Sequence, residues 1–363
     1  MPRKKLNLLG FSHESLVEFF ESIQQPKFRA SQLMKWIHQR GELDFMEMTD
    51  FSLELRQELF QLAVAEPPEV EDCLRSPEGT KKYLIKLESG SMIEMVKIPE
   101  KKRLTLCISS QAGCALQCTF CATGAQGFER NLSPAEIIGQ LWIANFYEKS
   151  SQQISNVVFM GMGEPLLNVG PVMSSISIMQ HQNAYGLSKR RITLSTSGIV
   201  PEIKKLADKT DVSLAISLHA ANNALRDEIV PINKKYPISE LIDSCKGYLS
   251  SQSKRKTITI EYILIDGVND TIKHAAELVK VLKGLSCKVN LIPFNPFDGC
   301  NYLRSQELTI QNFKDHLICK GVITTLRITR GDAIDGACGQ LVGKLQNSIK
   351  GKNNNRINIV HTS

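Results

Sequence analysis

Short apolar runs rich in β-branched residues alternate with helical patterns over most of this 363-residue chain, and this alternation constrains the fold more than any other feature. Six runs predict strands at 103–109, 157–161, 190–196, 212–218, 257–265 and 288–294, and a seventh follows at 324–330. Helical patterns lie at 134–147, 171–180, 201–207, 238–248, 271–282 and 307–319. Strands and helices that alternate with right-handed crossovers build a parallel α/β sheet, either doubly wound or curled into a barrel. Periodicity alone does not choose between these two.

The residues before the first of these strands divide into two parts. Amphipathic patterns predict helices at 14–23, 28–38 and 53–62, and the pair Pro67-Pro68 ends this region. Residues 81–87 and 91–99 alternate in polarity around a turn, which predicts a β-hairpin. We therefore expect a small helical N-terminal accessory domain, a β-hairpin extension, a core domain, and a loop with a basic tail, at residues 1–70, 71–99, 100–333 and 334–363.

Composition excludes several classes of protein. Hydrophobic residues make up 42% and charged residues 22%, which is ordinary for a globular protein and excludes wholesale disorder. No run approaches the roughly 18 apolar residues of a membrane span, and the apolar stretch after the basic start MPRKK is too short for a secretory signal. We therefore expect a cytoplasmic protein that does not use a membrane. The net charge of +7 permits a polyanionic partner without requiring one.

The end of the chain is basic. From Lys344 onward it carries Lys350, Lys352 and Arg356 but no acidic residue. A solvated tail is the simpler interpretation, and contact with a nucleic-acid backbone is the alternative.

Three cysteines follow the first predicted strand. Cys114, Cys118 and Cys121 have the spacing C-x3-C-x2-C, so their thiolates can converge on one metal centre. The alternatives are chance clustering of buried cysteines and a zinc site, but a closed zinc site requires four ligands and no fourth one lies at a familiar spacing. A [4Fe-4S] cluster held by three cysteines leaves one iron open for a further ligand. The loop after a strand is also where α/β proteins build their active sites.

Polar residues follow several other strands. The second strand runs into Gly161-Met162-Gly163-Glu164-Pro165, which lacks the third glycine of a dinucleotide-binding fingerprint, so we reject that interpretation. The third strand ends at Ser195, the fourth at Ser217-Leu218-His219, and Asn295 follows the sixth. Hydroxyl groups at strand ends are often only local caps. In a parallel sheet, however, all of these ends meet at one edge, beside the three cysteines.

The cysteine spacing, with Phe120 just before the last cysteine, resembles that of the radical S-adenosylmethionine (SAM) enzymes. The resemblance implies a partial (β/α)6 barrel and a [4Fe-4S] cluster on Cys114, Cys118 and Cys121. It also implies that SAM chelates the open iron and is cleaved reductively to a 5′-deoxyadenosyl radical. The implied SAM contacts are Gly163, Glu164, Ser195, Ser217, Leu218, His219 and Asn295, with Glu164 as the acceptor for the SAM ammonium group.

Two further cysteines bear on the chemistry. Cys338 lies in the glycine-rich segment 331–339, whose small residues allow the backbone to move. Cys107 lies in the first predicted strand, where alternation can point it into a barrel. For either thiol taken alone, an inert buried cysteine is the competing interpretation.

Taken together, the motifs resemble the RlmN/Cfr family of radical SAM RNA methyltransferases. The matching segments span nearly the whole chain and include LCISSQAGCALQCTFCATGAQGFERNL, VVFMGMGEPLLN, RRITLSTSG, AISLHA, IPFNP and GDAIDGACGQ. The resemblance implies methylation of adenosine C2 in the peptidyl transferase region of 23S rRNA, and in tRNA just 3′ of the anticodon. The rival hypotheses are Cfr-like methylation of C8 and an iron-sulfur RNA-binding protein without turnover.

Adenine C2 is an electron-poor carbon without a lone pair, so it cannot attack a SAM methyl group directly. The resemblance implies that Cys338 takes a methyl group from one SAM and that a second SAM supplies the radical. It further implies that Cys107 resolves the covalent protein-RNA adduct through a disulfide with Cys338, and that Glu94 accepts the C2 proton. A surface carboxylate is the plain alternative for Glu94.

The same resemblance suggests partners. We expect 23S rRNA and tRNA as substrates, an electron donor such as flavodoxin or ferredoxin, and a monomeric protein. The N-terminal domain and the basic surface are expected to bind RNA largely through backbone charge and shape, so that binding weakens with salt.

Overall fold

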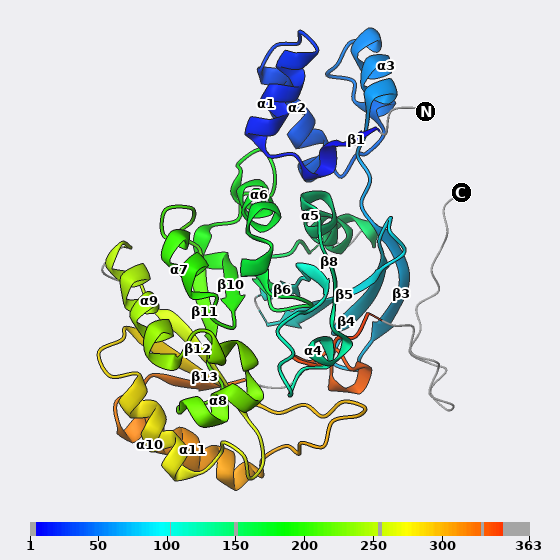
Figure 1. Cartoon of the computed structure of the whole chain (residues 1–363). Helices are drawn as coiled ribbons and strands as arrows, with labels where there is room; N and C mark the ends of the chain where they lie inside the picture. The colour runs from blue at the N-terminus through cyan, green and yellow to red at the C-terminus, as the bar shows by residue number, and fades with distance from the viewer. Residues whose placement is uncertain (1–4, 102, 149–151, 253–255, 328–329, 344–363) are drawn as a thin grey trace.

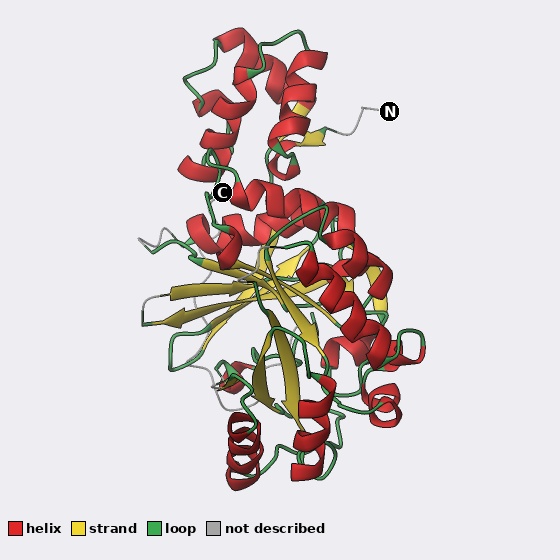
Figure 2. Ribbon diagram, turned by 90° about the vertical axis from the view of Figure 1, so that its left-hand side faces the viewer, coloured by secondary structure: helices red, strands yellow, loops and turns green. Residues whose placement is uncertain are grey.

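The computed structural model describes residues 5–101, 103–148, 152–252, 256–327 and 330–343 (Figure 1). Its centre is a ten-stranded sheet in the order β14-β13-β12-β11-β10-β9-β6-β5-β4-β3. The strands from β6 to β14 run parallel, and β5, β4 and β3 extend the sheet antiparallel. The order follows the chain without reversal, so the sheet lacks the switch point of a doubly wound fold. It curls instead into a partial barrel, as the resemblance implied (Figure 2).

The barrel strands coincide with the predicted runs. They are β6 (Arg103–Cys107), β9 (Asn156–Phe159), β10 (Ile192–Thr196), β11 (Ser213–Ser217), β12 (Ile258–Leu264), β13 (Cys287–Pro293) and β14 (Thr324–Leu326). The antiparallel extension is β3 (Glu69–Arg75), β4 (Lys81–Lys86) and β5 (Met92–Glu100), of which β4 and β5 confirm the predicted hairpin. Two small sheets pair β1 (Leu6–Asn7) with β2 (Ala63–Val64) and β7 (Gln111–Gly113) with β8 (Phe128–Asn131).

Helices cover the outer face of the barrel. They are α5 (Pro134–Trp142), α6 (Val169–Gln180), α7 (Val200–Leu206), α8 (Asn223–Ile229), α9 (Ile238–Ser250), α10 (Ile272–Val281) and α11 (Glu307–Cys319). Helix α5 begins with a capping box, in which Ser133 and Glu136 each accept the backbone N–H of the other, and with Pro134 in its first turn. Each predicted helix is present, whereas α8 was not predicted. None of the helices in the described ranges is long and apolar enough to cross a membrane.

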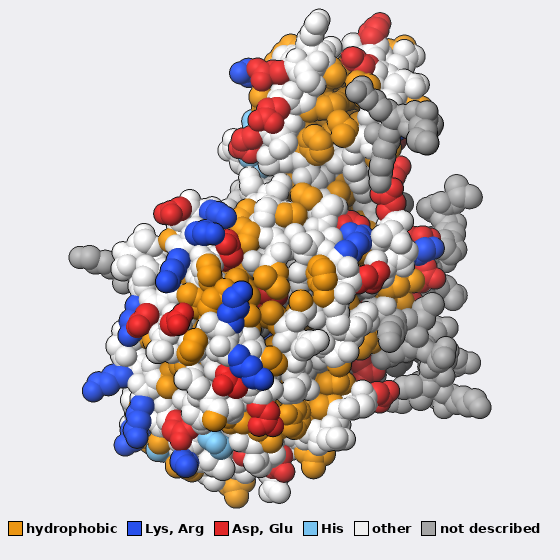
Figure 3. All heavy atoms as spheres, viewed as in Figure 1, with side chains coloured by type: hydrophobic (Ala, Val, Ile, Leu, Met, Phe, Trp, Pro, Cys, Tyr) orange, Lys and Arg blue, Asp and Glu red, His pale blue; other side chains and the backbone are white. Residues whose placement is uncertain are grey.

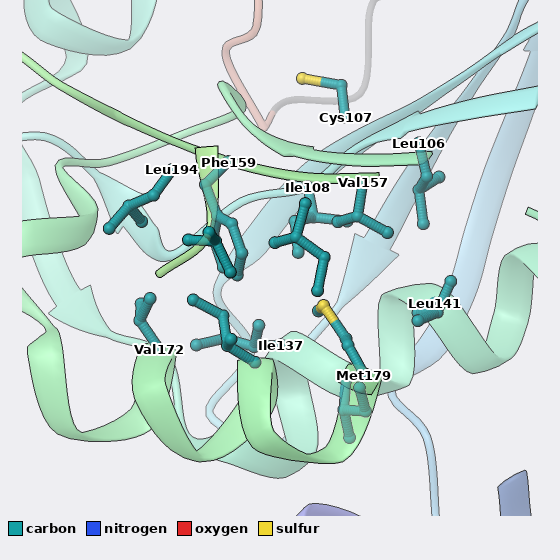
Figure 4. Close-up of a cluster of buried hydrophobic side chains, with 14 of the residues drawn as sticks. Leu106, Cys107, Ile108, Ile137, Leu141, Val157, Phe159, Val172, Met179 and Leu194 are labelled. Carbon is teal, nitrogen blue, oxygen red and sulfur yellow. The ribbon is translucent and has the colours of Figure 1, made fainter. Parts of the chain in front are cut away.

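The main core lies between the sheet and these helices. Figure 4 shows Leu106 of β6 and Ile108, the residue that directly follows β6, with Val157 and Phe159 of β9, on the side of the sheet that faces the helices. All four side chains are buried. Cys107 points to the opposite side of β6, toward the interior of the barrel. Alternation along the strand therefore separates the hydrophobic core from the interior that holds the chemistry.

The N-terminal domain contains α1 (His13–Ser22), α2 (Phe28–Lys35), a wide π turn at Trp36–Arg40, and α3 (Leu53–Leu62), as predicted. It rests on the barrel through polar contacts. The indole N–H of Trp142 donates to the carbonyl of Ile37 at 3.1 Å, and His38 Nδ1 lies 3.1 Å from the Tyr185 hydroxyl. The expected boundary at residue 70 lies inside strand β3, and the tail from Lys344 lies outside the described residues.

Candidate active site

The three clustered cysteines lie in the loop that joins β7 to the short helix α4 (Ala122–Gln126). Tight backbone packing shapes this loop. Gly113 has φ of +70°, and a Cβ at this position would lie 1.9 Å from the carbonyl oxygen of Gly127, so only glycine fits. The next residue, Cys114, donates its N–H to the same Gly127 carbonyl at 2.8 Å. Cys121 caps α4 and donates its N–H to the carbonyl of Cys118 at 3.1 Å.

All three cysteines line one pocket, which we call the cluster pocket. Its volume is about 140 Å³. The remaining wall comes from the carboxyl ends of other barrel strands and includes five of the predicted SAM contacts, Gly163, Glu164, Ser195, Ser217 and His219. Residues that are far apart in sequence therefore meet here, as parallel strands require.

Glu164 is one of the two carboxylates that line the cluster pocket, and it is 3% exposed. Its Oε2 accepts the N–H of Ser197 at 2.8 Å, and its Oε1 accepts the N–H of Leu166 at 3.0 Å. Burial raises the pKa of this carboxyl, and the hydrogen bonds from Ser197 and Leu166 oppose that rise. Side-chain hydrogen bonds from Thr196 and Ser197 also lower the pKa of Glu164, so an incoming ammonium group would share this carboxylate with those donors.

His219 contributes a neutral imidazole. Its Nδ1 accepts the N–H of Ile263 at 3.0 Å, and burial lowers the pKa of the ring to about 3. The ring proton must then reside on Nε2. His219 has φ of +61°, and its ring packs edge-on against Phe120 with 4.7 Å between ring centroids. A strained backbone thus holds this donor beside the cysteine loop.

The neighbouring strand ends are close together. The hydroxyl oxygens of Ser195 and Ser217 lie 3.5 Å apart. Leu218, by contrast, is fully buried and does not line the cluster pocket. Its carbonyl accepts a hydrogen bond from Arg226 at 3.0 Å, so any contact of Leu218 with a cofactor would be through its backbone.

A second, larger cavity of about 600 Å³ fills the barrel interior toward the amino ends of the strands, and we call it the barrel cavity. Cys107 and Cys338 both line it, and Cys338 also lines the cluster pocket. The other residues shared by the two spaces are Met160, Glu261, Ile292 and Arg327. Burial, together with the nearby Cys338 sulfur, raises the pKa of Cys107 to about 12. Cys338 therefore stands at the junction of the two spaces, within electrostatic reach of Cys107.

Asn295 lines the barrel cavity rather than the cluster pocket. Its Nδ2 donates to the carbonyl of Cys338 at 3.4 Å. Its Oδ1 is buried and has no hydrogen-bond partner among the described residues.

Glu94 lines neither space, and it is 1% exposed, which rejects the surface-carboxylate alternative. Its Oε1 lies 3.2 Å from Nζ of Lys82, and its Oε2 accepts the N–H of Val342 at 3.0 Å. Burial raises the pKa of Glu94, and the Lys82 ammonium opposes that rise. The chain that follows Cys338 therefore covers this carboxylate.

Comparison with known proteins assigns the family. Residues 6–65 match the ribosomal RNA large subunit methyltransferase N-terminal domain, and residues 108–279 match the radical SAM superfamily. The dual-specificity RNA methyltransferase RlmN of Marinomonas sp. (strain MWYL1) is 53% identical over 354 residues, covering 96% of this chain and 95% of the relative. The chain belongs to the RlmN family of RNA methyltransferases.

Two further matches agree with this RlmN assignment. The RlmN protein of Marinobacter nauticus is 50% identical, over 96% of this chain and 95% of the relative. A crystal structure of a radical SAM methyltransferase from Sphaerobacter thermophilus superposes with a TM-score of 0.88 at 37% identity, covering 93% of this chain and all of that one.

Membership in the RlmN family, within the radical SAM superfamily, implies a [4Fe-4S] cluster and SAM. The residues present fit these groups. Burial raises the pKa of Cys118, and the nearby sulfurs of Cys121 and Cys114 raise it further, so the three thiols are mutual neighbours. In the described ranges, no three His, Cys, Asp or Glu side chains are arranged to hold a single metal ion. A cluster does not need such a group, because each cysteine binds a different iron.

Sequence reasoning missed Arg226, which is fully buried behind the RlmN-type cluster pocket. Its guanidinium donates to the carbonyls of Leu218, Ser197 and Ser217 at 3.0, 2.7 and 3.2 Å, and to Asn233 Oδ1 at 3.0 Å. Burial lowers its pKa to about 10, which leaves it charged at neutral pH. Arg226 therefore joins the ends of β10 and β11, where two of the predicted SAM contacts lie.

Glu261 and Arg327 were also missed, and both line the two spaces that meet at Cys338. Glu261 Oε2 accepts from Asn290 Nδ2 at 2.9 Å, and burial raises the pKa of its carboxyl. The nearby Cys338 sulfur, followed by Glu261 and Cys107, raises the pKa of Arg327. A charged residue within each of two apolar strand patterns was the sequence signal that could have found them. Charged side chains are rarely fully buried unless they are paired.

Proposed function

We propose that this protein methylates C2 of an adenosine in 23S rRNA, and of the adenosine just 3′ of the anticodon in tRNA. The curated relatives that are dual-specificity RNA methyltransferases, at 50% to 53% identity over nearly the whole chain, support an RNA substrate. One observation carries the mechanism: Cys338 lines both the cluster pocket and the barrel cavity that contains Cys107. A methyl carrier that serves a cofactor on one side and a base on the other requires this position.

When bound on Cys114, Cys118 and Cys121, the cluster with SAM supplies a methyl group and a hydrogen-abstracting radical. Cys338 takes the methyl group on its sulfur by nucleophilic displacement. After hydrogen abstraction, the carbon on Cys338 bonds to C2 and links protein to RNA. The adduct then loses the C2 proton and one electron, for which the cluster, when bound, would be the acceptor. Arg327 lies within electrostatic reach of both sulfurs, and its positive charge favours the thiolate form of Cys107.

Release of the product requires a second thiol. Cys107, as thiolate, attacks the Cys338 sulfur, so that a disulfide forms and the bond from sulfur to the transferred carbon breaks. The released carbon takes up a proton and becomes the methyl group of the product. In the resting protein the raised pKa of Cys107, about 12, keeps this thiol protonated and slow to react. An external thiol then reduces the disulfide for the next cycle.

We also propose Glu94 as the acceptor of the C2 proton. Its pKa, raised by burial, suits a carboxyl group that must bind a proton during turnover. The N–H of Val342 now occupies its Oε2, so Glu94 acts only when the segment that follows Cys338 shifts. The same shift would move Cys338, which couples proton removal to the position of the methyl carrier.

The test is an anaerobic assay of the reconstituted protein with undermodified RNA and SAM that carries a CD3 group. We expect 2-methyladenosine that retains two deuterium atoms, identified by mass spectrometry of the digested RNA. Cys338→Ala should abolish methylation, and Cys107→Ala should trap a covalent protein-RNA adduct. Cys245→Ala, which removes a buried thiol remote from both spaces, is the matched control.

Other results would change the assignment. An 8-methyl product would support Cfr-like chemistry, and a product with all three deuterium atoms would reject transfer through Cys338. We further propose a monomer that takes electrons from a flavodoxin or ferredoxin and works in the cytoplasm, where ribosomes and tRNA meet.

A further inference from the structure

The barrel cavity opens at the end opposite the cluster. Its wall includes the first residues of several strands, Arg103 of β6, Asn156 of β9 and Ser213 of β11, and Lys288 near the start of β13. The cluster cysteines lie at the other end, where the strands finish. Building on the proposed function, we infer that the target nucleotide enters the barrel at the amino ends of its strands. It reaches Cys338 through the barrel cavity, with the RNA backbone held by Arg190 and Lys288.

Space and access support this route. The cluster pocket lies on one side of Cys338 and is bordered by the cluster cysteines and the predicted SAM contacts. With that side occupied, a base can meet the Cys338 sulfur only from the barrel cavity. The cavity volume of about 600 Å³ lies within the roughly 300–1,000 Å³ of typical ligand sites.

The lining of the cavity is unusual for a barrel interior. Parallel barrels usually fill this volume with bulky branched apolar side chains. Here hydroxyl groups project into it from three neighbouring strands and the residue before β12, namely Thr193, Ser213, Thr257 and Thr259. None of these hydroxyls makes a hydrogen bond within the described residues, so each can bond to a base edge or a ribose hydroxyl.

The positively charged side chains at the opening of the barrel cavity favour the binding of RNA. The side chains of Arg190 and Lys288 are exposed and form no hydrogen bond or ion pair within the described residues, although Lys288 lies within electrostatic reach of Glu261. Arg103, also at the opening, pairs with Glu100. By contrast, the face of the N-terminal domain seen in Figure 3 carries acidic and apolar side chains with little positive charge. The unpaired cations of the opening are therefore suitable contacts for phosphate.

The experiment separates the two halves of the reaction. A double variant, Arg190→Glu with Lys288→Glu, is first incubated with SAM alone, and methylation of Cys338 is measured by peptide mass spectrometry. RNA is then added, and transfer to adenosine is followed. We expect Cys338 methylation at the wild-type level and transfer to RNA reduced at least ~10-fold, because two phosphate contacts are lost and reversed. The control is Lys204→Glu with Lys273→Glu, two exposed lysines on the outer helices α7 and α10.

Neutral variants provide a second measurement. Arg190→Gln and Lys288→Gln should each lower the slope of log affinity for single-stranded RNA against log salt concentration by about 0.7. Transfer to RNA equal to that of the control variant would overturn the inference. The inference would also be overturned if the double variant lost Cys338 methylation and transfer to RNA equally, or if the neutral variants left the dependence of RNA affinity on salt unchanged. If wild-type Cys338 takes up no methyl group, the proposed function fails instead, and the two failures are therefore distinguishable.

Discussion

Arg226 is the largest side chain that is completely buried, and no carboxylate forms an ion pair with it among the described residues. Its charge is balanced by four hydrogen bonds, three of them to backbone carbonyls at the ends of β10 and β11. Such a group is costly to bury unless each donor finds a partner. Arg226 therefore fixes the strand ends that carry Ser195 and Ser217, rather than acting on a substrate.

Replacement of Arg226 by Met should remove the guanidinium donor from the buried carbonyls of Ser197 and Ser217, whereas the carbonyl of Leu218 keeps the N–H of Ala220 at 2.8 Å. Each such group costs about 1–3 kcal/mol, so we expect the free energy of unfolding to fall by ~3 kcal/mol or more in urea titration. Arg191→Met, at an exposed position, should change it by less than ~0.5 kcal/mol. Equal midpoints for the two variants would contradict this role of Arg226.

Single residues differed in how well the sequence predicted them. Cys114, Cys118 and Cys121 were found because ligand spacing within one loop is a local property. Arg226 was missed because it lies in the short polar helix NALRDEI, where arginine normally faces solvent. Arg226 is buried because it packs against the ends of β10 and β11, which are distant in sequence. A local sequence pattern does not predict such packing.

At the scale of single elements, the barrel strands were easier to predict from the sequence than the strand at the edge of the sheet. The barrel strands are short runs rich in β-branched residues, and the side chains that face the helices are apolar and buried. Strand β3, with the sequence EVEDCLR, was not predicted, since only Val70 and Cys73 of its side chains are buried. Its pairing with β4 supplies the order that its own sequence lacks.

The cluster loop offers an element-scale prediction. Gly113→Ala would place a Cβ 1.9 Å from the Gly127 carbonyl and also strain a backbone with positive φ. We expect the loop to lose its fold and the purified, reconstituted protein to bind far less iron per chain. Gly90→Ala is the matched control, because Gly90 also has positive φ but a Cβ added there would meet nothing within 4 Å. Full iron content in the Gly113 variant would show that the loop tolerates the clash.

The whole molecule depends on contacts that no single segment encodes. Periodicity left open whether the sheet is doubly wound or a barrel, and the order of strands in space decides this in favour of the barrel. The docking of the N-terminal domain was likewise not predictable. It rests on buried apolar packing, with Leu8 and Leu9 in the same core cluster as Ile137 of α5, and on polar contacts such as His38 to Tyr185, which join residues far apart in sequence.

This interface should make stability depend on pH. Burial, with a smaller contribution from His181, lowers the pKa of His38 from its ordinary 6.5 to about 3. The unfolded chain then binds a proton that the folded chain excludes, so stability is present above pH 6.5 and is lost as the pH falls toward 3. Between these two pH values, the neutral His38 lowers the free energy of unfolding by about 1.4 kcal/mol for each unit that the pH falls.

His38→Gln should therefore flatten the dependence of the free energy of unfolding on pH between 6.5 and 5, as measured in urea at each pH. His274→Gln, on the outer helix α10, is the control and should retain the wild-type slope. An unchanged slope in the His38 variant would mean that the ring is not held neutral at the interface.

The segment that carries Cys338 is hydrogen-bonded directly to the loop and helix that carry the three clustered cysteines. Ala122 donates its N–H to the carbonyl of Gly339 at 2.7 Å, and Thr123 Oγ1 donates to the carbonyl of Leu341 at 2.6 Å (Figure 1). Linkage is reciprocal, so whatever orders helix α4 also orders the chain around Cys338, and the reverse. If the proposed function holds, the supply of iron would therefore govern the position of a residue that binds no iron. A cell short of iron would then lose the geometry of its methyl carrier together with its source of radicals.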